Sequence, residues 1–157
     1  MANRDFFELK VLKWTFRVPK DLLYNENDCW VRIEGDKARV GITDFLQSMA
    51  TDIIFVECKD VGMKIDQLDE VASFESSKTI LDLISPVSGV IIEVNEKLSE
   101  RPELVNQDPY GGGWFAVLQL NDLESDRENL LDAGKYFDVL KRKVEAEKEK
   151  LGKEEMI

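Results

Sequence analysis

The chain has 157 residues, 43% of them hydrophobic, which is enough for one domain with a buried core and too few for two large domains. Thirty-two acidic against twenty-one basic residues give a formal charge of −11, which disfavours nucleic acid and anionic membranes and favours protein partners with basic surfaces. No stretch approaches the roughly 20 apolar residues of a membrane span, and residues 1–8 lack a signal-peptide core, so we expect a cytoplasmic protein.

Residue types that usually carry out catalysis or bind metals are scarce in this chain. It contains no histidine, which removes the usual general base at neutral pH and the commonest metal ligand. The two cysteines, Cys29 and Cys58, form no CxxC pair, so we expect half-buried thiols and neither a zinc site nor a disulfide. The sequence therefore disfavours an independent enzyme, and we expect no catalytic residue and no metal site.

The first part of the chain predicts short strands separated by turns. Residues 1–13 mix aromatic and charged groups without a clear period, and we treat them as an extension that precedes the domain. Residues 14–19 alternate aromatic and polar side chains, which predicts a strand with one buried face. Residues 30–42 predict a hairpin with a tight Gly-Asp turn, after which Thr43 or Asp44 is suited to cap a short helix.

The middle of the chain predicts a run of apolar strands. Residues 53–58 are mostly apolar, and we expect this strand to be buried on both faces. Residues 71–75 and 79–84 are rich in aliphatic and β-branched side chains, and they are separated only by Ser-Ser-Lys. This arrangement predicts a hairpin with Lys78 at its tip. After a second turn, residues 90–95 predict another strand.

Helical signals increase toward the end of the chain. Pro102 is suited to the first turn of a short helix, and residues 108–113 predict a flexible turn before a strand over 114–120. From Ser125 onward apolar residues recur close to helical spacing. Residues 141–155 carry Glu and Lys with few apolar anchors, which predicts a solvated helix that frays.

These elements together indicate a mostly β fold, a sandwich or barrel with short helices and a C-terminal helix. We divide the chain into an extension at 1–13, a domain at 14–140 and a charged helical tail at 141–157.

A lysine at a hairpin tip is open to acylation, but most such lysines only provide a solubilising charge. The neighbouring residues change this interpretation, because from about Val18 to about Leu140 the chain resembles the glycine cleavage H-protein family. Four ordered blocks carry the resemblance: residues 30–32 (Trp-Val-Arg) with 41–44 (Gly-Ile-Thr-Asp), residues 52–57 with 60–62, residues 75–78 (Glu-Ser-Ser-Lys) with 85–89 (Ser-Pro-Val-Ser-Gly), and residues 102–106 with 108–114.

The resemblance implies a lipoyl/biotinyl-type β sandwich-barrel and a cofactor, lipoate, joined by an amide to Lys78. Glu75, Ser76 and Ser77 would complete the attachment site, with Glu75 a candidate for recognition by the lipoylating enzyme. In the family the arm carries an aminomethyl group from glycine decarboxylase (P-protein) to the aminomethyltransferase (T-protein), and dihydrolipoyl dehydrogenase (L-protein) reoxidises it. The chain itself would be a non-catalytic carrier, and its acidity favours a monomer that docks transiently onto these enzymes.

The chain departs from the family pattern beside the first block. Asp28 and Cys29 precede Trp30 where the family usually has His-Glu. We expect this difference to affect either the contacts with partner proteins or the cavity for lipoate. Thr79 follows the lysine where a small residue is usual. Neither change removes the acceptor lysine.

Three aromatic residues are candidates to line a cleft for the arm: Trp30, Tyr110 and Trp114. For both tryptophans a place in the core is the first expectation, because most such aromatic side chains are buried there.

Other carriers and a plain binding module remain open from the sequence. An H-protein-like lipoate carrier for a heterodisulfide-reductase-like sulfur oxidation pathway fits the extension and the Asp28-Cys29 departure. A biotin carrier holds its lysine on a similar hairpin, but methionines usually flank that lysine, where this chain has Ser77 and Thr79. The last alternative is an interaction module in which Lys78 is never modified.

Overall fold

A computed structural model describes residues 5–156. The strands in chain order are β1 (Phe6–Val11), β2 (Trp14–Pro19), β3 (Leu23–Tyr24), β4 (Cys29–Glu34), β5 (Lys37–Ile42), β6 (Ile53–Cys58), β7 (Lys64–Ile65), β8 (Glu70–Ser76), β9 (Ile80–Ile84), β10 (Gly89–Val94) and β11 (Ala116–Leu120). The helices are α1 (Asp44–Ala50), α2 (Lys97–Glu100), α3 (Leu104–Gln107), α4 (Leu123–Asp126), a 3-10 turn at Arg127–Asn129, and α5 (Ala133–Met156).

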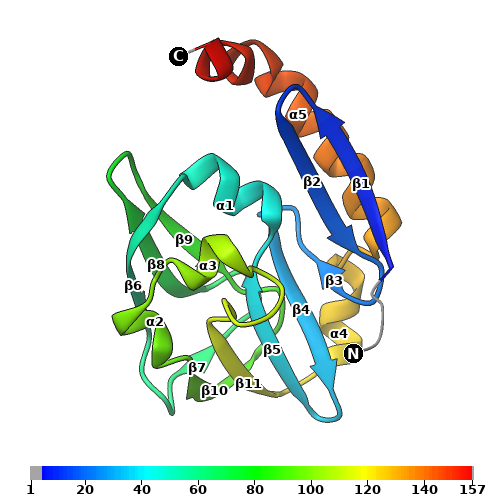
Figure 1. The fold of residues 1–157 in the computed structure, drawn as a ribbon. Coiled ribbons are helices and arrows are strands. Elements are labelled where there is room, and N and C mark those ends of the chain that lie inside the picture. Colours follow the sequence, from blue (N-terminus) through cyan, green and yellow to red (C-terminus); the bar gives the residue numbers. More distant parts are fainter. Residues whose placement is uncertain (1–4, 157) are drawn as a thin grey trace.

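The strands form three antiparallel sheets (Figure 1). A six-stranded sheet has the order β3-β4-β5-β11-β10-β7, a three-stranded sheet has the order β6-β8-β9, and β1 pairs with β2 alone. The predicted mostly β fold with short helices and a C-terminal helix is confirmed. In Figure 1 the hairpin of β1 and β2 lies along α5, beside the body formed by the two larger sheets.

The principal core lies between the six-stranded and three-stranded sheets. Fully buried side chains from both sheets meet there, among them Val31 and Val40 on one side and Phe74 and Leu83 on the other. Hydrophobic burial of this kind is the main stabilising contribution to a small domain. It fixes β8 and β9 against the larger sheet and so positions the hairpin that these two strands form.

A second core joins α5 to the opposite face of β4. Trp30 is buried there with Phe16 of β2, while the adjacent Val31 points into the principal core. From α5, Tyr136 stacks on Tyr24 with ring centroids 4.6 Å apart, and Leu140 is fully buried. The C-terminal helix is therefore part of the packed structure.

Several local predictions are confirmed. β4 and β5 form the predicted hairpin, and Gly35 in its turn has a φ of 67° that suits glycine. Thr43 is the N-cap of α1, where its hydroxyl accepts a hydrogen bond from the Leu46 N–H at 3.3 Å.

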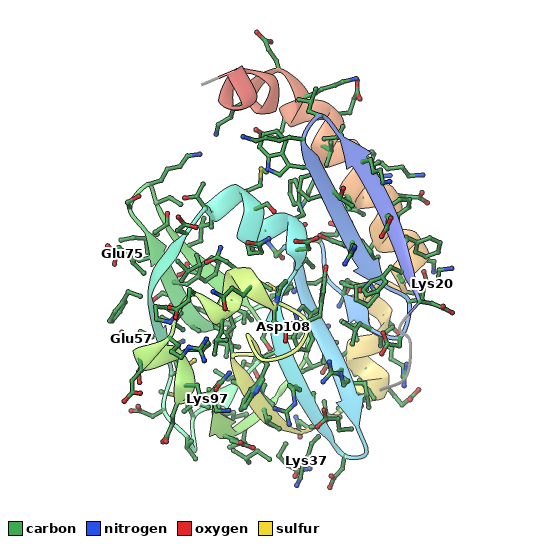
Figure 2. The ribbon with its side chains drawn as sticks, in the orientation of Figure 1. Lys20, Lys37, Glu57, Glu75, Lys97 and Asp108 are labelled. Carbon is green, nitrogen blue, oxygen red and sulfur yellow. The ribbon has the colours of Figure 1, made fainter. Side chains whose placement is uncertain are left out.

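Strand β6 is more exposed than we expected. The prediction of burial on both faces is wrong, because Ile54 is 57% exposed and Phe55 is 51% exposed. The reason is that β6 is an edge strand of the three-stranded sheet, which pairs only with β8 and presents its outer face to solvent. Figure 2 shows Glu57 of β6 and Glu75 of β8 on this same side of the molecule.

The segment at residues 108–113 is fixed by hydrogen bonds, in contrast to the flexible turn that we expected. The Asp108 carbonyl accepts hydrogen bonds from the backbone N–H groups of Gly111 (3.1 Å) and Gly113 (2.9 Å). The Asp108 carboxylate accepts a further hydrogen bond from the Gly112 N–H at 2.8 Å.

The first residue of β10 has to be glycine for a steric reason. Gly89 pairs with Leu120 of β11, and a Cβ at Gly89 would lie 2.2 Å from the backbone oxygen of Gln119. We expect Gly89→Ala to lower the free energy of unfolding by about 2–3 kcal/mol, because the sheet must shift to admit the methyl group.

Urea denaturation measures this loss, and Gly112→Ala is its control. A Cβ at Gly112 would meet only Asp108 Oδ2, at an ordinary 3.6 Å, so its effect should stay within about 0.5 kcal/mol. Equal stability of the two variants would refute the steric argument.

Candidate functional site

The hairpin of β8 and β9 holds the candidate lysine in a defined turn. The Ser76 N–H donates to the Thr79 carbonyl at 2.9 Å, which closes the turn. The hydroxyl oxygen of Ser76, which is buried, accepts hydrogen bonds from the backbone N–H groups of Lys78 at 3.1 Å and Thr79 at 3.2 Å. The Ser76 side chain thus fixes the backbone of Lys78. Serine side chains often stabilise turns in this way.

The four predicted site residues are contiguous but face different surroundings. Ser77 and Lys78 are exposed at the tip, whereas Ser76 is buried and Glu75 is half-buried. Glu75 lies between Phe55 of β6 and Ile80 of β9 in the register of the three-stranded sheet, and both of these apolar neighbours are more than half exposed. Lys78 is therefore reachable from solvent, beside a surface that combines apolar groups with a carboxylate.

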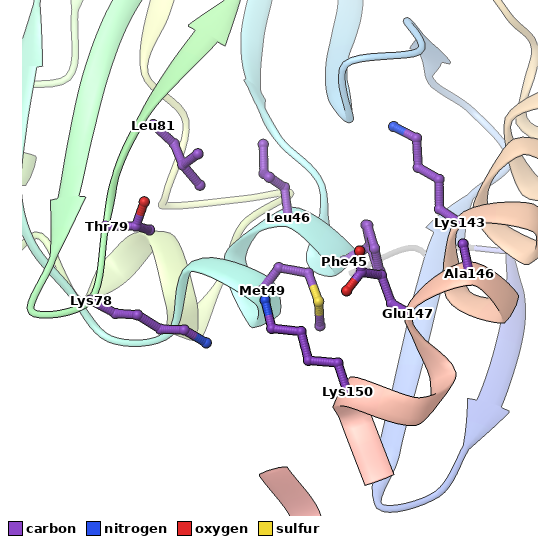
Figure 3. Close-up of a pocket in the computed structure, with 10 residues that line it drawn as sticks. All are labelled: Phe45, Leu46, Met49, Lys78, Thr79, Leu81, Lys143, Ala146, Glu147 and Lys150. Atoms are coloured by element: carbon purple, nitrogen blue, oxygen red, sulfur yellow. The ribbon is translucent and has the colours of Figure 1, made fainter. Parts of the chain in front are cut away.

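A pocket of about 630 Å³ lies next to the hairpin tip (Figure 3). Three elements enclose it: the hairpin, helix α1 and helix α5. Its lining residues are Lys78, Thr79 and Leu81 from the hairpin, Phe45, Leu46 and Met49 from α1, and Lys143, Ala146, Glu147 and Lys150 from α5. Among the four predicted site residues, Lys78 alone contributes to this lining.

The aromatic candidates lie away from this pocket. Trp30 is fully buried and donates from Nε1 to the Pro109 carbonyl at 3.0 Å, so its expected place in the core is confirmed. The Tyr110 hydroxyl donates to the Arg17 carbonyl at 2.6 Å. Trp114 is half-buried with the Arg39 guanidinium 4.3 Å from its ring centroid. The suggestion that these three line the cleft is wrong for the pocket beside Lys78.

Asp28, the first residue of the departure from the family pattern, anchors helix α5. Its carboxylate accepts a hydrogen bond from the Tyr136 hydroxyl at 2.6 Å and pairs with the Lys143 ammonium at 2.8 Å. Burial raises the pKa of Tyr136 well above its ordinary value, and the nearby Asp28 charge adds to this effect, so the hydroxyl stays protonated. Asp28 adopts a positive φ of 64°, a conformation that Asp tolerates better than most residues.

Both cysteines are free thiols with low reactivity. Cys29 is fully buried, which goes further than the half-buried state we expected, and Cys58 is half-buried. Burial raises the pKa of Cys29 to about 12 and that of Cys58 to about 11.

Two kinds of feature are absent from the part of the chain that the structure describes. None of its helices is both long and apolar enough to span a lipid bilayer. No three Cys, Asp or Glu side chains in residues 5–156 come together in a way that would hold a metal ion.

Comparison with known proteins identifies the family. The sequence model of the glycine cleavage H-protein family matches residues 22–143. The chain belongs to the glycine cleavage H-protein family. It is similar to the glycine cleavage system H protein of a Geobacillus species (strain WCH70), with 47% identity over 123 residues, which cover 78% of this chain and 96% of the relative.

Two other similarities agree with this membership. The glycine cleavage system H protein of Geobacillus thermodenitrificans is 49% identical over 118 residues, which cover 75% of this chain and 92% of the relative. The crystal structure of a glycine cleavage system H protein from Mycobacterium marinum superimposes with a TM-score of 0.68 and 33% identity, covering 76% of this chain and 95% of that one. The predicted resemblance and the lipoyl-type fold are both confirmed.

The family match leaves two segments uncovered. Strands β1 and β2 precede residue 22, and the second half of α5 follows residue 143. The division of the chain at residues 13 and 140 stays a prediction. Residues 6–11 nevertheless pair along their whole length with residues 14–19, so the predicted extension and the first predicted strand of the domain form one hairpin.

The contribution of α5 to the pocket was missed by the sequence analysis. The apolar spacing from Ser125 onward predicted a helix, and the charged run at residues 141–155 indicated that its end is solvated and frays. No local pattern locates the second half, because its position depends on the Asp28–Lys143 pair, whose members are 115 residues apart.

Proposed function

We propose that this chain is the lipoyl carrier protein of a glycine cleavage system and that lipoate is joined by an amide to Nζ of Lys78. The observation that carries the proposal is the position of Lys78, which is the exposed tip of a fixed hairpin beside a pocket. This hairpin lies within the segment that the family model matches.

The pocket suits the arm in size and in chemistry. Phe45, Leu46, Met49 and Leu81 give it an apolar lining that matches an aliphatic chain and a dithiolane ring. Its volume of about 630 Å³ is ordinary for a small-molecule site. By bond counting, the lysine stem and the fatty chain together reach roughly 10–15 Å. If lipoate is attached there, it would supply the sulfur that carries an aminomethyl group between enzymes.

The residues around Lys78 present it to those enzymes. Ser76 fixes the backbone of the tip, and the exposure of Ser77 leaves space for an enzyme to reach the lysine. Glu75 offers a half-exposed carboxylate to the lipoylating enzyme, on a face that also displays Phe55 and Ile80. Exposed apolar side chains beside a charge are typical of protein docking surfaces.

In this proposal the chain carries out no reaction step of its own. Its partners are glycine decarboxylase, the aminomethyltransferase, dihydrolipoyl dehydrogenase and the lipoylating enzyme. The charge of −11 steers the carrier toward basic surfaces on these larger proteins and speeds its transient association with them.

Mass spectrometry of the intact protein and of its peptides, isolated from the native cell, tests the proposal. We expect a lipoyl adduct on Lys78 and on no other lysine. A biotinyl adduct at this residue would instead show that the protein is a biotin carrier of a carboxylase. An unmodified Lys78 in cells that are actively degrading glycine would refute the proposal.

A further inference from the structure

Part of the pocket wall comes from outside the family match. The match ends at residue 143, yet Ala146, Glu147 and Lys150 of α5 line the pocket opposite the Lys78 hairpin. Figure 3 shows these side chains on the far side of the pocket from Lys78 and Thr79, with α1 between the two walls. The segment of α5 after residue 143 thus gives this chain a wall that the matched family segment does not include.

This wall is held firmly in place. Asp28 binds both Tyr136 and Lys143, and the Lys143 ammonium also donates to the Glu26 carbonyl. Val144 is buried, one residue beyond the end of the match. Farther back on α5, Phe137 stacks on Phe7 of β1 with ring centroids 5.2 Å apart. Strand β1, which precedes the family match, therefore packs on α5 and supports the helix from its outer side.

Glu147 is the one carboxylate in the lining of this pocket. It is half-buried, and within residues 5–156 no hydrogen bond or ion pair engages it. Lys143, one helical turn earlier, is already engaged by Asp28. Figure 3 shows the Glu147 carboxylate beside Phe45, whereas the Lys150 side chain extends toward Met49. A partly desolvated carboxylate beside an aromatic ring is stabilised when a cation binds to it.

We infer that the second half of α5 is a wall of the site that shelters the loaded arm, and that Glu147 binds the protonated primary amine at the end of that arm. The inference rests on the proposed function, because the amine is the cargo that the lipoyl arm would bring. In the loaded arm the ring is open, and its sulfur-bearing end would lie against the apolar side chains of α1 while the ammonium group would lie against Glu147. Without cargo the arm is neutral and makes no use of this carboxylate.

The test compares the full-length lipoylated protein with its Glu147→Gln variant. Glycine decarboxylase from the same organism transfers the aminomethyl group of glycine to the oxidised arm of each protein and releases CO2. Both loaded proteins are then separated from the enzyme and followed by intact mass spectrometry as the cargo is lost. We expect the variant to lose its cargo roughly tenfold faster, as the loss of one charge-assisted hydrogen bond implies. The rate at which a water-soluble phosphine reduces the unloaded, oxidised arm should be unchanged, because that arm carries no charge.

Glu145→Gln is the matched control, since Glu145 lies on the same helix, is exposed and does not line the pocket. It should behave as wild type in both measurements. A Glu147→Gln lifetime equal to that of wild type would overturn the inference and leave the carrier function intact. Equal acceleration of both rates, or the same effect from Glu145→Gln, would also overturn it. A protein without lipoate on Lys78 would refute the proposed function first.

Discussion

Protein with Lys78→Arg is expected to carry no lipoyl group and to support no glycine cleavage above background, while it folds normally. Arginine keeps the positive charge and nearly the length of lysine. Its guanidinium stays protonated at all physiological pH values, so it offers no free amine for amide formation. Because residue 78 is an exposed tip residue whose backbone is held by Ser76, the midpoint of thermal unfolding should change by no more than about 2 °C.

The measurement combines intact mass spectrometry with a reconstituted glycine cleavage assay. Lys37→Arg is the matched control, because Lys37 is likewise an exposed lysine beside a tight hairpin turn, between β4 and β5. It should keep full lipoylation and full activity. Lipoylation of the Lys78→Arg protein at another lysine, with activity preserved, would show that the attachment site lies elsewhere.

Asp28→Asn is expected to lower the free energy of unfolding by about 2 kcal/mol, because it removes the charge that anchors α5. Asparagine tolerates the positive φ of this position and keeps the shape of the side chain, so the change isolates the charge. The Asp28 side chain is 9% exposed, whereas that of Lys143 is 34% exposed, so solvent screening reduces the effect below that of a fully buried ion pair.

Urea denaturation measures this loss, and amide hydrogen exchange locates it. We expect faster exchange in α5 than in the principal core. Asp138→Asn is the control on the same helix, because its exposed pair with Lys141 should contribute no more than about 0.5 kcal/mol. If Asp28→Asn is as stable as Asp138→Asn, Asp28 does not anchor the helix.

The site was predictable from sequence where it depends on local structure. The hairpin with Lys78 at its tip follows from two β-rich runs separated by three residues, and the Thr43 cap from a residue type next to an apolar run. In such elements each residue interacts with neighbours a few positions away. The order of residues therefore determines the geometry almost directly.

The remaining features depend on pairings between distant segments. An apolar run such as residues 53–58 does not reveal whether its strand lies at the centre or the edge of a sheet, so the exposure of Ile54 and Phe55 was missed. The charged half of α5 has the composition of a solvated helix. It forms a pocket wall because Asp28, far away in the sequence, holds Lys143.

The low reactivity of the two thiols would matter for a chain that, as we propose, carries a disulfide on a lipoyl arm. A nearby thiolate would attack the dithiolane and trap it as a mixed disulfide, in competition with the partner enzymes. With a pKa near 11, Cys58 is ionised in only about one molecule in ten thousand at pH 7, and Cys29 in fewer. Burial of these thiols would thus keep the proposed carrier from cross-linking its own arm and would reserve the redox chemistry of the arm for the partner enzymes.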